Sequence, residues 1–162
     1  VVGRDGWVLS PPGEESEYPA VTLNHFGKGK VAYISAEVFR AYWETDNMHL
    51  KYLIKNLVDA VTPEKMIEVD APSLVEVSLM KQGHRMIVHL VNYHSARKQL
   101  SEGPPEKIPA ISNVNVKLKL NQKPKQVIQM PENKKLDWKF ENKYLSFEAQ
   151  LLKIHSCVLI QY

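Results

Sequence analysis

The sequence predicts an α+β fold in which a small α/β remnant, a hairpin plus a helix in residues 1–63, precedes an antiparallel β-sandwich in residues 64–162. Two observations support this division. A helical pattern of apolar residues stops at Pro63, which cannot continue a helix. Beyond Pro63, short segments of alternating apolar and polar residues are separated by turns about every ten positions, which is typical of a sandwich.

The first predicted element is a β-hairpin. Residues 1–18 are rich in glycine, proline and glutamate and predict a loop. Residues 21–26 alternate apolar and polar side chains, which is the period of a half-buried strand. Gly27-Lys28-Gly29 then predicts a tight turn, because glycine accepts a positive φ. Residues 30–35 are more continuously apolar and predict the second, more buried strand.

The second predicted element is an amphipathic helix. Asp46 is the residue type that caps a helix N-terminus, and Pro63 ends the pattern. The apolar residues between them share one helical face, at Leu50, Leu53, Ile54, Leu57, Val58 and Val61.

The connection between hairpin and helix, residues 36–45, is rich in aromatic and charged residues. In open α/β sheets, loops at the carboxyl ends of strands are where ligands bind. Arg40, Tyr42, Trp43 and Glu44 are therefore the substrate-binding candidates, suited to stacking on a ligand and to hydrogen bonds with its hydroxyl groups. The alternative is that the two aromatic residues pack against the rest of an α/β layer.

The same connection holds three carboxylates. Glu37, Glu44 and Asp46 lie close enough in sequence to supply a general acid and a general base. The simpler interpretation is a helix cap at Asp46 and two solvated acids, so we assign no catalytic residue.

The β half begins with a hairpin. Residues 74–81 and 85–93 are two apolar strands joined by a turn at Gln82-Gly83-His84. Both faces of the second strand are apolar, which predicts an interior strand of the sandwich. A polar loop at residues 92–113 follows. The remaining strands are predicted at residues 114–120, 126–130, 136–140, 144–149 and 154–162.

Histidine and cysteine residues could supply other chemistry. Cys157 is the only cysteine, so an internal disulfide is excluded. His155 and Cys157 share a strand face and could form a dyad, but a structural cysteine is the favoured interpretation. His89 lies in an apolar strand and predicts a hydrogen-bonded core histidine. The other histidines lack metal-ligand spacing, so we expect no metal and no cofactor.

Charge and hydropathy limit the classes of partner that we expect. The net charge is +3, and the lysines of the last third alternate with apolar residues. This pattern indicates the solvated face of a sheet rather than a nucleic-acid surface. No apolar run approaches the roughly 18 residues that span a bilayer. We therefore expect neither a nucleic acid nor a membrane as a partner.

Several short motifs follow one another along the chain. They are Gly27-Lys28-Gly29-Lys30-Val31-Ala32-Tyr33, Tyr42-Trp43, the helix of residues 50–61, Val69-Asp70-Ala71-Pro72, Val75-Glu76-Val77-Ser78-Leu79 and Ile87-Val88-His89-Leu90-Val91-Asn92-Tyr93. Over residues 20–162 this series resembles the C-terminal part of bacterial glycoside-hydrolase-like proteins. In that family a barrel is followed by a glutamine-amidotransferase-like domain, similar to the trimerisation domain of family 42 beta-galactosidases, and a terminal β domain.

The resemblance implies a C-terminal fragment whose catalytic carboxylates lie upstream. Its role would be structural, with the upstream domains of its own parent chain and a homo-oligomer as partners. The alternative is a carbohydrate-binding sandwich that stacks sugars on Trp138, Tyr144 or Trp43. Independent hydrolase activity is the third hypothesis, and we do not expect this segment alone to be an enzyme.

Overall fold

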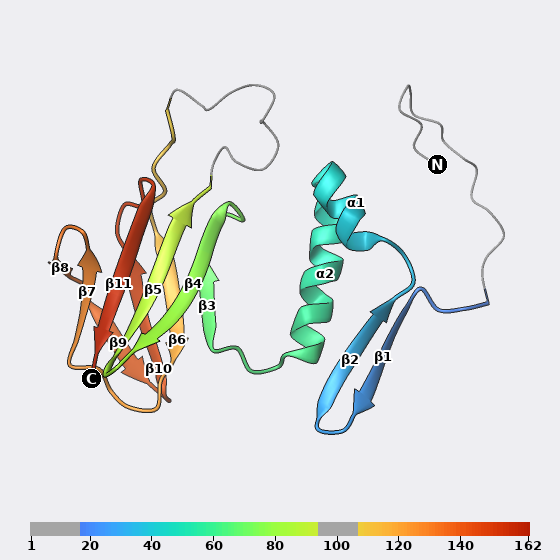
Figure 1. The fold of residues 1–162 in the computed structure, drawn as a ribbon, viewed down its shortest axis with the longest axis horizontal. Helices are drawn as coiled ribbons and strands as arrows, with labels where there is room; N and C mark the ends of the chain where they lie inside the picture. Colours follow the sequence, from blue (N-terminus) through green and yellow to red (C-terminus); the bar gives the residue numbers. More distant parts are fainter. Residues whose placement is uncertain (1–16, 94–106) are drawn as a thin grey trace. The chain divides into compact units, whose positions relative to one another are not determined.

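The computed structural model describes residues 17–93 and 107–162, and the chain forms two compact units, Val1–Glu64 and Lys65–Tyr162 (Figure 1). The described residues form two helices and eleven strands, with every strand pair antiparallel. The α+β class predicted from the sequence is therefore confirmed. The loop expected at residues 1–16 and the part of the polar loop at residues 94–106 lie outside the described residues.

The first unit contains the predicted hairpin. Strand β1 (Val21–Phe26) pairs with β2 (Gly29–Ile34), and Val21 lies opposite Ile34. The turn depends on Gly27, whose φ of 57° lies in the left-handed region that glycine adopts without a steric penalty.

Two helices follow the hairpin instead of a loop and one helix. The connection predicted at residues 36–45 is mostly helical, because α1 (Val38–Thr45) occupies it, and α2 (Met48–Val61) follows. Asp46 was predicted to cap the second helix, but it ends the first, and its N–H donates to the Tyr42 carbonyl. The N-cap of α2 is Asn47, whose side chain accepts from the His49 N–H.

The described part of the first unit has almost no core of its own. Helix α2 contacts both α1 and β2, yet none of its residues is buried. Val38 is the one buried apolar residue in residues 17–64. Large apolar side chains are exposed throughout this range: Tyr18, Leu23, Phe26, Val31, Tyr33, Phe39, Trp43, Met48, Tyr52 and Val58.

The second unit is a sandwich of two antiparallel sheets (Figure 1). The four-stranded sheet has the order β3 (Ile67–Asp70), β6 (Val114–Lys119), β10 (Tyr144–Ala149), β9 (Trp138–Glu141). The five-stranded sheet has the order β4 (Val75–Gln82), β5 (Arg85–Asn92), β11 (His155–Gln161), β7 (Gln126–Met130), β8 (Lys134–Lys135). Strand β5 is interior, as its apolar pattern predicts.

The core lies between the two sheets. In β6, Val114, Val116 and Leu118 are buried, whereas Asn115 and Lys117 are exposed, so the alternation read from the sequence holds. Inward residues of the other strands and three leucines of the connections complete one cluster, with Val88, Leu90, Leu120, Val127, Leu136, Leu145, Phe147, Ala149, Leu152, Val158 and Ile160. Burial of each valine, leucine, isoleucine or phenylalanine side chain in this cluster contributes roughly 1.5–3 kcal/mol relative to exposure.

One strand, predicted at residues 136–140, begins two residues later than predicted. Strand β8 ends at Lys135 and β9 begins at Trp138. Leu136 lies between them, where its N–H donates to the Val127 carbonyl and its side chain enters the core. The chain therefore passes from one sheet to the other at this point, which the alternation alone does not reveal.

Candidate functional site

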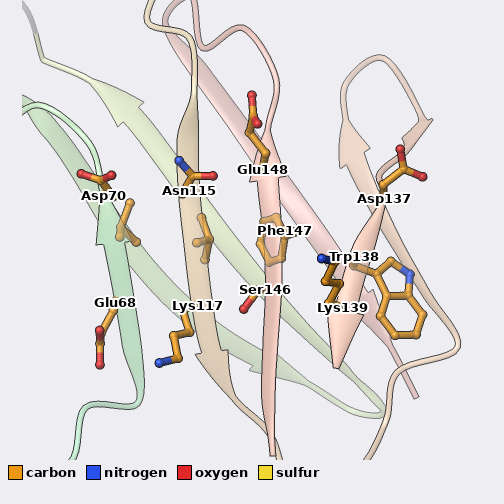
Figure 2. A pocket seen from close by; sticks show the side chains of 12 residues that line it. Glu68, Asp70, Asn115, Lys117, Asp137, Trp138, Lys139, Ser146, Phe147 and Glu148 are labelled. Carbon is orange, nitrogen blue, oxygen red and sulfur yellow. The ribbon is translucent and has the colours of Figure 1, made fainter. Parts of the chain in front are cut away.

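A shallow polar hollow of about 750 Å³ lies on the outer face of the four-stranded sheet (Figure 2). All four strands of this sheet contribute to its lining. Antiparallel register explains why residues so distant in sequence meet there, because directly paired residues point to the same face.

The hollow contains two cross-strand rows of polar side chains. The first row follows the register of the four strands and consists of Glu68, Lys117, Ser146 and Lys139. The second row holds Asp70, Asn115 and Glu148, and Figure 2 shows Asp137 at the same end of the hollow. One end is thus acidic, while the lysines lie in the adjoining row.

Two aromatic residues are associated with this sheet. The Lys117 Nζ lies 4.6 Å from the centre of the Tyr144 ring, and the Lys123 Nζ lies 5.8 Å from that of Trp138. Both distances are those of cation–π contacts. Trp138 also packs against the core from the edge strand β9. Each ring therefore has a flexible lysine where a stacked sugar would lie.

The chemistry of the hollow suits binding rather than cleavage. Carboxylates, an amide, a hydroxyl and ammonium groups supply both donors and acceptors for polar ligands. A glycosidase acid, in contrast, is held in an apolar pocket. Glu68, Asp70 and Glu148 are all exposed on the sheet surface.

The substrate-binding candidates lie on α1, and the helix brings only some of them together. The Arg40 Nε donates to the Glu44 Oε1 at 2.9 Å, and its Nη1 lies 3.6 Å from the Glu37 Oε2. The hydrogen bond and charge of Glu44 raise the pKa of the Arg40 guanidinium. These are exposed helical pairs, which contribute little to stability.

The aromatic candidates of α1 differ in exposure. Trp43 is 62% exposed, whereas Tyr42 is half-buried. Two residues of helix correspond to a rotation of about 200°, so Tyr42 and Arg40 project from opposite sides. A sugar site formed by Arg40, Tyr42, Trp43 and Glu44 remains a prediction.

His89 is not a core histidine, although its strand pattern predicts one. It lies half-buried on the outer face of the five-stranded sheet and interacts with His155. Cys157 is a free, half-buried cysteine, and burial raises the pKa of its thiol. Within residues 17–93 and 107–162, no three His, Cys, Asp or Glu side chains form a group that could hold a metal ion. Neither described helix is long and apolar enough to cross a membrane.

The hollow was missed in the sequence. The signal for each strand was present, since polar residues alternate with buried ones in β6 and β10. The lysines were interpreted only as a solvated face. Pairing of β3 with β6 and of β9 with β10 brings the rows together, and strand order is not encoded in any single strand.

Comparisons with known proteins relate the chain to segments of two glycoside hydrolases. No family model matches. The β-galactosidase LacZ of Heyndrickxia coagulans is 35% identical over 75 residues, which are 46% of this chain and 10% of that protein. The structure of α-L-fucosidase isoenzyme 2 from Paenibacillus thiaminolyticus matches 94% of this chain and 23% of its own, with a TM-score of 0.77 and 21% identity. The chain thus shares sequence with part of one such enzyme and its fold with part of another.

Proposed function

We propose that this chain is a non-catalytic accessory region of a glycoside hydrolase, and that its first unit packs against other domains of that enzyme. The observation that carries the proposal is the poor burial of the first unit. In residues 17–64 only Val38 is a buried apolar residue, while Tyr33, Phe39 and Trp43 are each more than 60% exposed. An apolar surface of this kind marks an interface.

One face of the β1–β2 hairpin carries exposed apolar side chains. Phe26, Val31 and Tyr33 project from one face, because Val31 pairs with Asn24 and Tyr33 with Thr22. All three are at least half exposed, whereas Ala32 and Ile34 on the opposite face are half-buried. Sheets of α/β layers are covered on both faces. A two-stranded hairpin with one covered face is marginal by itself.

The comparisons support the carbohydrate context of this proposal. Both matched proteins have names of glycoside hydrolases, and the matched segments span 10% and 23% of them. Segments of that size have large neighbouring domains against which to pack. The hairpin and helices would then be the last part of an amidotransferase-like layer, related to a trimerisation domain, and a homo-oligomer would form through that layer.

The proposal is tested by dye binding and sedimentation on the 162-residue chain. We expect an apolar dye to bind and the chain to self-associate. The double change Val31→Thr with Tyr33→Thr should reduce both without lowering the melting temperature of the sandwich. Met80→Thr with Tyr93→Thr is the matched control, since these exposed residues belong to the second unit. A monomer that binds no dye would contradict the proposal.

Catalysis is tested separately with aryl glycosides. We expect no turnover by this chain, because the exposed carboxylates of α1 and of the polar hollow lie in solvent rather than in an apolar pocket. Hydrolysis that survives removal of contaminating enzymes would overturn the non-catalytic assignment.

A second candidate function is carbohydrate binding in the polar hollow. The specific observation is the convergence of donors and acceptors from four strands beside Trp138, with the lining residue Lys117 lying over the Tyr144 ring. Calorimetric titration with a broad glycan panel tests this candidate. Binding that is lost in Asn115→Ala and Tyr144→Ala, but kept in the exposed control Gln122→Ala, would support it. If no glycan of the panel binds, this candidate is wrong and only the structural role remains.

A further inference from the structure

We propose that the free edge of strand β4 is a dimerisation surface, at which β4 pairs in antiparallel fashion with β4 of a second copy of this chain. The two five-stranded sheets then form one continuous sheet across a two-fold axis. This inference does not rest on the proposed function, because it concerns the second unit and uses none of the apolar side chains of the first. It rests on the length of the edge, on its backbone groups and on the charges beside it.

Strand β4 differs from the other edge strands of the sandwich. Within the described residues it has a hydrogen-bonded neighbour on one side only, β5, and it is eight residues long. The opposite edge of the same sheet, β8, is two lysines, and β3 and β9 are four residues each. Short strands and lysines protect an edge from pairing with another chain. In β4 the inward residues Val75, Val77 and Leu79 are apolar, and its one lysine, Lys81, is exposed near the end of the strand.

The backbone groups on the free edge follow from the pairing of β4 with β5. The Tyr93 N–H donates to the Leu74 carbonyl, which continues this pairing by one residue pair. Hydrogen-bonded and non-hydrogen-bonded pairs alternate along an antiparallel ladder, so the even-numbered residues of β4 bond to β5. The N–H groups that point to the free edge are consequently those of Val77, Leu79 and Lys81.

These donors define the register of the dimer. The Val75 N–H donates to the Pro72 carbonyl at 2.9 Å and is not available for pairing. Pairing Leu79 with Leu79 of the second copy places Val77 opposite Lys81, and each edge N–H then meets a carbonyl. Because directly opposed residues point to the same face, the apolar inner face of each sheet continues into the other. Val77 and Leu79, which are half-buried at the edge, gain apolar neighbours.

Charge complementarity identifies the occupant of the edge as a second copy. Arg85 lies opposite Gln82, and its Nε and Nη2 donate to the Gln82 Oε1 at 2.9 Å and 2.6 Å, so the guanidinium reaches across to β4. In the register centred on Leu79, Glu76 of one copy lies opposite Gln82 of the other, on the face that Arg85 occupies. The two-fold axis repeats this contact between Glu76 and Arg85. A parallel pairing would instead place like charges side by side.

This arrangement stops at two copies. A two-fold axis pairs the β4 edge with itself, so both β4 edges are used and the assembly closes. The outer edges of the continuous sheet are then the two β8 strands, where Lys134 and Lys135 oppose further pairing. The expected product is therefore a dimer rather than a fibre.

Sedimentation equilibrium of the 162-residue chain carrying Val31→Thr and Tyr33→Thr tests the pairing, since these changes reduce association through the first unit. We expect a reversible dimer. Glu76→Arg should weaken it at least about tenfold, because both symmetric contacts change from attraction to repulsion. Arg85→Glu should act likewise, and the combination of Glu76→Arg with Arg85→Glu should restore dimerisation. Glu148→Arg is the matched control, since it makes the same charge change at an exposed position of the interior strand β10.

Residue-resolved amide exchange, measured by NMR at low and high protein concentration, distinguishes edge pairing from any other contact. The amides of Val77, Leu79 and Lys81 should exchange at least about tenfold more slowly at high concentration, whereas that of Ser78 is already protected by β5. Melting curves verify that every variant is folded. A chain that stays monomeric, a dimer that Glu76→Arg leaves unchanged, or protection of another edge strand in place of these amides would overturn the proposal.

Discussion

Gln129 illustrates how single buried polar residues hold the sandwich together. Its side chain is 3% exposed and makes two hydrogen bonds with the backbone of Gln150, at 2.7 Å and 3.2 Å. The Gln129 amide thus forms a pair of hydrogen bonds, like those of a β-sheet, between β7 and the segment after β10. Asn92 acts similarly, since its Nδ2 donates to the carbonyls of Pro109 and Lys153 at 2.9 Å each.

Replacement of Gln129 by alanine should lower the free energy of unfolding by about 1–3 kcal/mol, because it removes both hydrogen bonds and leaves partly buried backbone groups unpaired. Gln122→Ala is the control, since Gln122 is exposed. Urea denaturation measures both variants. Equal midpoints for the two variants would show that the hydrogen bonds of the Gln129 side chain contribute nothing to stability.

Cys157 should make stability fall at alkaline pH. Burial raises the pKa of its thiol above the ordinary value of 9.0, so the unfolded chain releases the proton first. The unfolded state therefore binds fewer protons as the pH rises past 9, and stability decreases in that range. The difference in denaturation midpoint between pH 7 and pH 10 should be smaller in Cys157→Ser, because the serine hydroxyl does not ionise in this range. Tyr162, whose pKa burial also raises, keeps part of the difference in the variant. An unchanged difference would contradict this assignment.

At the scale of elements, β6 and α2 should respond very differently to truncation. Leu118 is fully buried between the sheets, whereas Val58 of α2 is 49% exposed. Leu118→Ala should cost about 2–5 kcal/mol, since it leaves a cavity in a packed core. Val58→Ala should change stability by less than about 0.5 kcal/mol. Thermal melts of both variants test the contrast, which fails if the helix variant is the more damaging.

The elements also show what could be predicted from the sequence. Strict alternation in residues 114–119 identified β6, and the apolar faces of residues 85–92 identified an interior strand. Helix α1 was missed because eight residues give little periodicity and its sequence is rich in aromatic residues. The polar hollow and the His89–His155 contact depend on strand order and register, which arise from long-range pairing and not from local pattern.

At the scale of the whole molecule, the two units should differ in independence. The second unit has a single core shared by both of its sheets, so residues 65–162 should fold without the first unit. The first unit should not, because residues 17–64 bury one apolar side chain. Circular dichroism of the two separate segments measures this, with a cooperative melt expected only for residues 65–162. A cooperative melt of the first segment would show that it has a sufficient core.

Hydrogen–deuterium exchange on the intact chain tests most directly whether the first unit depends on a partner. Amides of β5 and β11 should exchange only through global unfolding. Amides of β1, β2 and α2 should exchange at least about a hundredfold faster, because local opening of these elements exposes little buried apolar surface. Equal protection of the two units would contradict this dependence.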